Sequence, residues 1–222
     1  NLSEISQIAG RAGRHINDGT FGITGECKQL SSDEIEKLEK HALNKVDMLY
    51  WRNSNINFDS LNGLIGSLEE KTSSEHLRRI NDCEDEKVLK FFIKNNKDIK
   101  NNNSKDYIKT LWECCQIPDF SKKTYGSHID VVKKVFEFLT SKPGKVTNDY
   151  MKKQLKDLDR YDGNIDTLTN RISNVRTWSY VANKKNWANN SDYWIERTKY
   201  IEDKLSDKLH EELTKSFVDK RI

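Results

Sequence analysis

Hydrophobic residues recur at helical spacing along most of the chain. Leu61, Leu64, Ile65 and Leu68 follow the i, i+3, i+4, i+7 pattern of an amphipathic helix. Similar apolar stripes lie at residues 35–42, 108–115, 129–139, 165–182 and 194–209. A chain with this periodicity is expected to be mainly α-helical and to pack its stripes together as a bundle.

Polar residues beside these stripes predict where several helices begin and end. Ser31 and Glu34 have the spacing of a capping box, so a helix is expected to start there. Ser127 and Ser191 are expected to open two later helices. Pro143, which follows the stripe at residues 129–139, is expected to stop that helix because proline cannot continue it.

The first part of the chain departs from this uniform helical pattern. Residues 3–12 predict a short helix, and the glycine-flanked segment at residues 19–25 contains β-branched and aromatic residues that predict a strand, the single strand expected. The Asn- and Lys-rich run at residues 95–103 lacks apolar periodicity and predicts a solvated loop. The sequence therefore predicts a short α/β remnant followed by a helical bundle, with a boundary between Leu43 and Asp59.

Composition narrows the class of protein without naming a partner. The 222 residues are 35% hydrophobic and 33% charged, which allows a core in a polar, soluble protein. No apolar run approaches the roughly 18 residues of a membrane helix. The net charge of +3 and the pI near 8.5 lie below the values typical of a basic nucleic-acid module. The four cysteines are Cys27, Cys83, Cys114 and Cys115. They do not have the spacing of zinc ligands, so no metal site is expected and the thiols are expected to be reduced.

The segment QIAGRAGR at residues 7–14 carries the most chemical information. Gly10 and Gly13 would cost a helix about 1 kcal/mol each relative to alanine, so close backbone packing beside a ligand is expected. Arg11 and Arg14 stand three residues apart, so on a helix they would point to one side. Two convergent guanidinium groups suit a triphosphate whose γ-oxygens gain charge during cleavage. The alternative is a basic turn that only touches a phosphate backbone.

This segment resembles motif VI, the last conserved motif of superfamily-two helicases. With Gln7-Ile8 at its start it is similar to RNA-processing helicases typified by the mitochondrial degradosome helicase, rather than to the DEAD-box or DEAH branches. Further segments resemble bacterial relatives of that enzyme and extend the resemblance over most of the chain. They are Trp51-Arg-Asn53, Cys115-Gln-Ile-Pro-Asp-Phe120, Asp166-Thr-Leu168, Arg176-Thr-Trp178 and Leu205-Ser-Asp207.

The resemblance implies a division of the chain and a cellular setting. Residues 1–45 would be the C-terminal end of a second RecA-like α/β domain, and residues 46–222 a helical C-terminal domain beside the nucleic-acid channel. The expected partners are single-stranded RNA or DNA, the missing RecA-like domains and an exoribonuclease, and no membrane. The expected location is the bacterial cytoplasm or, alternatively, the mitochondrial matrix.

The resemblance also implies roles for the motif residues. Arg14 would be the arginine finger and Arg11 the contact to the γ-phosphate. Gln7, Gly10 and Gly13 would face ATP, which is held with magnesium mainly by the other RecA-like domain.

The sequence departs from a complete ATP site. It contains no G-x-x-x-x-G-K-[ST] phosphate loop, and no Asp-Glu pair follows a buried strand where it would hold magnesium. With Asn1 rather than Met at its start, the chain is interpreted as a fragment that carries half of an ATP site and has no ATPase activity by itself.

A second set of residues is a candidate nucleic-acid contact. Arg171, Arg176 and Lys185 lie with Trp178 along one stretch that is predicted to be helical, and basic and aromatic side chains together suit a single strand. In the competing interpretation, Trp178 and Trp187 fill the core and the charges form a solvated face.

Two functions of other classes remain open at this stage. The chain is also compatible with a helical binding module, derived from a helicase, that no longer hydrolyses ATP. A DNA helicase or translocase is the third possibility, because motif VI does not distinguish the sugar.

Overall fold

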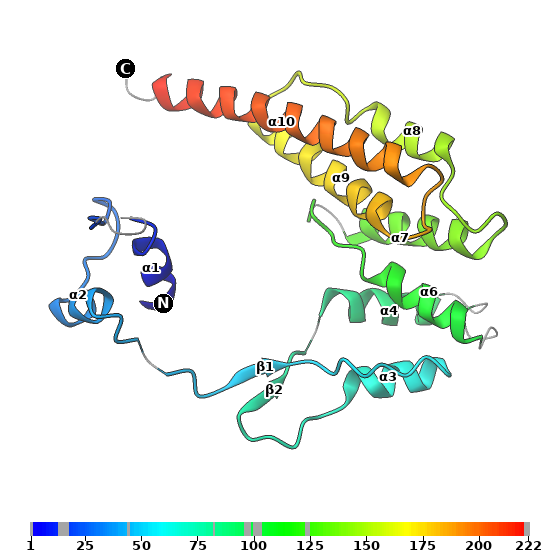
Figure 1. The fold of residues 1–222 in the computed structure, drawn as a ribbon, viewed down its shortest axis with the longest axis horizontal. Coiled ribbons are helices and arrows are strands. Elements are labelled where there is room, and N and C mark those ends of the chain that lie inside the picture. The colour runs from blue at the N-terminus through cyan, green and yellow to red at the C-terminus, as the bar shows by residue number, and fades with distance from the viewer. Residues whose placement is uncertain are drawn as a thin grey trace. The chain divides into compact units, whose positions relative to one another are not determined.

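The computed structural model describes residues 2–12, 18–43, 45–81, 83–95, 99, 104–122 and 125–219. Contacts divide the chain into two units. Unit 1 comprises Asn1–Trp51 and Thr72–Arg78, and unit 2 comprises Arg52–Lys71 and Arg79–Ile222. The protein is mainly helical, as its periodicity predicts, and Figure 1 shows the helices of each unit.

Unit 1 contains two short helices and most of a two-stranded sheet. Its elements are α1 (Leu2–Ala9), α2 (Ser32–Glu39), β1 (Leu49–Trp51) and β2 (Leu77–Arg79), and β1 pairs with β2. The predicted capping box is confirmed: Glu34 N–H donates to Ser31 Oγ, and the Glu34 carboxylate accepts from Ser31 N–H at 2.8 Å. These bonds satisfy backbone donors that the first turn of α2 leaves without helical partners.

The strand predicted at residues 19–25 is wrong. Residues 18–24 have no regular structure, and the strands of the described chain lie instead at β1 and β2. Phe21 and Ile23 are exposed. β-Branched and aromatic residues favour a strand only where a neighbouring strand completes the ladder, and none of the described residues pairs with this segment.

Unit 2 is built from seven described helices. They are α3 (Leu61–Glu69), α4 (Glu84–Asn95), α6 (Lys105–Cys115), α7 (Tyr125–Thr140), α8 (Asn148–Lys156), α9 (Ile165–Asn183) and α10 (Ser191–Asp219). The stripes at residues 61–68, 108–115, 129–139, 165–182 and 194–209 are confirmed as helical, and α4 and α8 are helices that the stripes did not predict. Only Met151 and Leu155 of α8 are buried, which is too few for a recognisable stripe.

Two predictions about segment boundaries need correction or fall outside the structure. Ser127 does not open a helix, because α7 already begins at Tyr125. Ser191 does stand at the first position of α10, as expected. The loop predicted at residues 95–103 lies mostly outside the described residues, although Ile99 within it is buried.

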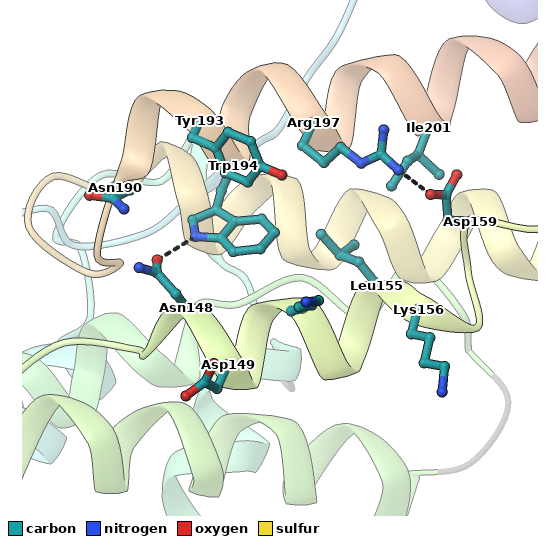
Figure 2. Close-up of a pocket in the computed structure, with 11 residues that line it drawn as sticks. Asn148, Asp149, Leu155, Lys156, Asp159, Asn190, Tyr193, Trp194, Arg197 and Ile201 are labelled. Atoms are coloured by element: carbon teal, nitrogen blue, oxygen red, sulfur yellow. Dashed lines mark hydrogen bonds and ion pairs between the residues drawn. The ribbon is translucent and has the colours of Figure 1, made fainter.

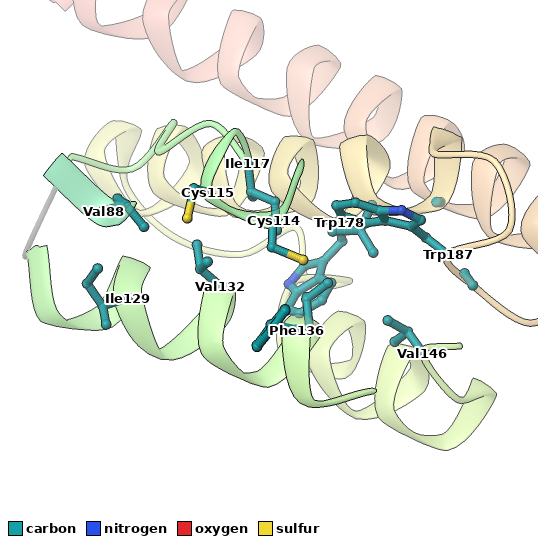
Figure 3. Close-up of a cluster of buried hydrophobic side chains, with 14 of the residues drawn as sticks. Val88, Cys114, Cys115, Ile117, Ile129, Val132, Phe136, Val146, Trp178 and Trp187 are labelled. Atoms are coloured by element: carbon teal, nitrogen blue, oxygen red, sulfur yellow. The ribbon is translucent and has the colours of Figure 1, made fainter. Parts of the chain in front are cut away.

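One hydrophobic core joins the helices of unit 2. Val88 of α4, Cys114 and Cys115 of α6, and Val132 of α7 belong to it, and Figure 3 shows these side chains together with Trp178 of α9. Burial raises the pKa of the Cys114 and Cys115 thiols, so both stay protonated at neutral pH. Both are free thiols in the described structure. None of the described helices is long and apolar enough to cross a membrane.

Candidate functional site

The arginine motif lies at the C-terminal end of α1. Gln7 is in the last turn, and the helix stops at Ala9, with Gly10 N–H bonded to Ser6 O at 2.8 Å. Arg11 is therefore in the turn that follows the helix. Whether it shares a face with Arg14 stays a prediction. Gln7, Gly10 and Arg11 are all exposed. Gly13 and Arg14 lie outside the described residues.

Unit 1, which carries this motif, has almost no core of its own. Leu38 is the one buried hydrophobic side chain among its described residues. By contrast, eight large hydrophobic side chains are exposed in it: Ile8, Phe21, Ile23, Ile35, Val46, Met48, Leu49 and Tyr50. The described part of unit 1 thus exposes far more of its large apolar side chains than it buries.

The predicted nucleic-acid contacts on α9 do not form one exposed surface. Trp178 is only 3% exposed, so the interpretation of Trp178 as a core residue is correct and base stacking on it is excluded. Arg171 donates to the carbonyl oxygen of Arg160 at 2.8 Å and has a side chain that is 13% exposed. Arg176 pairs with Glu202 of α10 at 2.7 Å, and Lys185 lies beyond the end of α9. The loop before α9 and helix α10 therefore engage Arg171 and Arg176, so these side chains do not form one open surface with Trp178.

The structure reveals instead an open groove between α8 and α10 (Figure 2). Its volume is about 650 Å³, within the range of small-molecule binding sites. Trp194 lies at its centre and donates from Nε1 to Asn148 Oδ1 at 3.0 Å, which ties α10 to the start of α8. Leu155 and Ile201, both buried, supply the other apolar contacts of the groove.

Backbone hydrogen bonds fix the end of this groove. Val146 N–H donates to Trp187 O at 2.7 Å, and Asn189 N–H donates to Val146 O at 3.0 Å. These bonds join the segment before α8 to the connection between α9 and α10. Thr147 then caps α8 by accepting from Tyr150 N–H at 3.3 Å. The groove is therefore held in place by the backbone as well as by the packing of Trp194.

Charged side chains of both signs line the groove. Arg197 pairs with Asp159, and the Tyr161 hydroxyl donates to the other oxygen of the same carboxylate. Burial and this hydrogen bond raise the pKa of Tyr161 to about 12, so Tyr161 remains a donor. Asp149, Lys152 and Lys156 complete the charged lining, and neither lysine forms an ion pair with any other residue of the described chain.

Aromatic and basic residues alternate along the exposed face of α10 beside the groove. Tyr193, Arg197, Tyr200 and Lys204 follow helical spacing. The Arg197 guanidinium lies 5.4 Å from the Tyr200 ring centroid, and the Lys204 ammonium lies 5.9 Å from it. Tyr193 is 58% exposed and lies at the groove itself. This i, i+4, i+7, i+11 spacing is present in the sequence, next to the apolar stripe at residues 194–209.

Comparisons with known proteins give no relatives. No family model, curated protein or solved structure matches the chain. No group of three or more metal-ligating side chains occurs among the residues that the structure describes.

Proposed function

We propose that the chain is the C-terminal portion of an ATP-dependent RNA helicase. In this proposal Arg11 and Arg14 complete an ATP site whose phosphate loop and magnesium ligands lie in further polypeptide. Gln7, Gly10 and Gly13 face the nucleotide, and the helices of unit 2 flank the RNA. The observation that carries the proposal is the segment QIAGRAGR in a unit that buries only one hydrophobic side chain among its described residues.

The exposed surface of unit 1 supports this assignment. A motif that acts on a nucleotide bound by another domain must remain accessible, and Gln7, Gly10 and Arg11 are exposed. The exposed apolar residues of the same unit, such as Phe21 and Tyr50, suit burial against the rest of an α/β domain. Both features are expected of the final segment of a RecA-like domain.

Chemistry gives each arginine a distinct role in this proposal. The planar guanidinium is always charged and binds phosphate oxygens through two parallel hydrogen bonds. Arg14 would neutralise the charge that develops on the transferred phosphoryl group, and Arg11 would hold the γ-phosphate in line for attack by water. ATP with magnesium supplies the reacting phosphates.

The test measures ATP hydrolysis by the longer polypeptide that contains these residues, with RNA at saturation. Arg14→Ala should lower kcat by roughly 10³–10⁵-fold, the contribution of arginine fingers in other phosphoryl-transfer enzymes. Arg14→Lys should rescue poorly because an ammonium lacks the planar fork. The 222-residue chain alone should release no phosphate.

An exposed arginine in the same unit provides the matched control. Arg78 of β2 is exposed, and Arg78→Ala should leave kcat unchanged. Turnover close to wild type in both Arg14 variants would show that Arg14 is not the finger.

The groove between α8 and α10 favours a second candidate function. A helical module that binds nucleic acid without hydrolysing ATP would need such a surface and would not need the arginine motif. Absence of a phosphate loop and of ATPase activity from the longer polypeptide would favour this second function over the first.

A further inference from the structure

The groove between α8 and α10 combines an exposed aromatic ring, two unpaired lysines and an apolar floor. We infer that it binds a single strand of nucleic acid, with one base stacked on Tyr193 and neighbouring phosphates at Lys152 and Lys156. The inference rests on the proposed function in one respect: the proposed RNA helicase is the reason for testing RNA first. It moves the nucleic-acid contact from α9, where the sequence predicted it, to α8 and α10.

Tyr193 is the aromatic side chain of the groove that is open to a ligand. More than half of its surface is exposed, while its contact with Trp194 is edge-to-face, with ring centroids 4.8 Å apart. That contact holds the tyrosine ring beside the groove without burying it. Tyr200 is less suited to stacking, because the cations of Arg197 and Lys204 already lie near its ring.

Lys152 and Lys156 supply the charge that is free to meet phosphate. Arg197 is already neutralised by Asp159, so its pair adds no net charge to the groove. Lys152 and Lys156 stand one helical turn apart on α8, and besides the paired Asp159 the acidic side chain of the groove lining is Asp149. The groove thus offers two phosphate contacts and a small net positive charge, and binding should depend only moderately on salt.

The shape of the groove favours one strand over a duplex. Its apolar floor of Leu155, Trp194 and Ile201 accepts the face or edge of an unstacked base. In a duplex the bases are already stacked on one another, so Tyr193 would find no free base face. Asn190, also in the groove lining, adds an exposed amide that can donate to or accept from a base edge.

The test titrates the 222-residue chain against a fluorescent uridine oligonucleotide of about 12 residues, within known single-strand site sizes. Tyr193→Ala should weaken binding by roughly 5- to 150-fold, the loss expected when one base is no longer stacked, and Tyr193→Trp should restore it. The double variant Lys152→Gln with Lys156→Gln should reduce the slope of log affinity against log salt by roughly 1.4, the value for two lost phosphate contacts.

Matched controls separate this surface from general charge effects. Lys87 and Lys109 are exposed lysines on α4 and α6, away from the groove, and their double glutamine variant should leave the salt slope unchanged. A thymidine oligonucleotide of equal length shows whether the groove distinguishes ribose from deoxyribose. Comparable affinity for both strands, or tighter binding of RNA, agrees with the inference.

Three outcomes would overturn the inference. They are no binding of either oligonucleotide, unchanged affinity in Tyr193→Ala, or an equal reduction of the salt slope in both lysine double variants. Displacement of the oligonucleotide by poly-glutamate in wild type and Tyr193→Ala alike would assign the groove to an acidic peptide instead. None of these measurements uses ATP or changes the arginine motif. A failure here therefore leaves the proposed ATP site intact, and a failed ATPase test leaves the groove intact.

Discussion

Arg171 and Lys152 carry the same charge, yet their surroundings give them different roles. Arg171 donates to main-chain oxygens in the loop before α9, so it holds that loop in place. Lys152 projects from a short helix beside an open groove and forms no ion pair with any described residue. A charge that is already satisfied within the fold stabilises the fold, whereas an unsatisfied one is available to a ligand.

His128 illustrates how burial couples a residue to pH. It lies in the first turn of α7 and is buried, and burial lowers its pKa below the usual 6.5, although Asp119 and Glu84 act in the opposite direction. Since the folded pKa is below the unfolded one, the unfolded state binds the proton more readily. The free energy of unfolding should therefore be unaffected by His128 above about pH 6.5 and should fall as pH drops below it.

Urea denaturation at several pH values between roughly 5 and 7.5 measures this effect. His128→Gln should flatten the dependence of the unfolding free energy on pH in that window. His210→Gln, at an exposed position on α10, is the matched control and should leave the dependence as in wild type. Identical pH profiles for wild type and His128→Gln would contradict the prediction.

At the scale of elements, side-chain caps define where the helices begin. The helices α2, α3, α6, α8 and α9 each follow a Ser, Thr or Asn whose side chain accepts from a backbone N–H three residues on. The cap satisfies a donor that has no carbonyl partner in the first turn. Local chemistry of this kind explains why these helix starts are sharp even where a helix contributes few residues to the core, as α8 does.

Asn164, the cap of α9, offers a direct test. Its Oδ1 accepts from Thr167 N–H at 2.9 Å and from the Thr167 hydroxyl at 2.7 Å. Asn164→Ala should destabilise the protein by about 1 kcal/mol, which lowers the melting temperature of a chain of this size by roughly 2–4 °C. Asn164→Asp, which retains an acceptor, should melt close to wild type. Calorimetry of both variants measures the difference. Equal melting temperatures for Asn164→Ala and wild type would show that this cap does not stabilise the protein.

At the scale of the whole molecule, the two units differ in how much they bury. Apart from Leu38, every buried hydrophobic side chain of the described residues belongs to unit 2, from Leu61 to Leu205. Because burial of apolar surface is the main favourable contribution to folding, unit 2 should carry nearly all of the stability.

Deletion of residues 1–45 tests this division. The remaining chain keeps both strands and all of unit 2, so its melting temperature should match that of the whole chain, and its far-ultraviolet circular dichroism should be helical. The solubility of the shortened chain should rise, because Ile8, Phe21, Ile23 and Ile35 are lost from the surface. A large fall in melting temperature, or a spectrum dominated by sheet or coil, would show that unit 1 supports unit 2.

The sequence by itself determined the features that depend on neighbours along the chain. The stripe from Ile165 to Ala182 and the capping box at Ser31 were readable, because helical periodicity and capping are set within a few residues. The burial of Trp178 was also expected from its place beside that stripe. The motif at residues 7–14 was recognisable from the sequence alone. The strand predicted at Phe21 and Ile23 was wrong because a strand needs a pairing partner, which the local sequence does not specify.

Only the tertiary structure decided which surfaces are free. Asn148 and Trp194 are 46 positions apart, and their hydrogen bond forms because α8 and α10 lie together in the fold. The loop before α9 holds Arg171, which the sequence had offered as a nucleic-acid contact, whereas the packing of α8 against α10 leaves Tyr193 beside an open groove. Helical periodicity shows which face of a helix is apolar, but which neighbour covers that face, and what stays exposed at the edges, depends on long-range packing between helices.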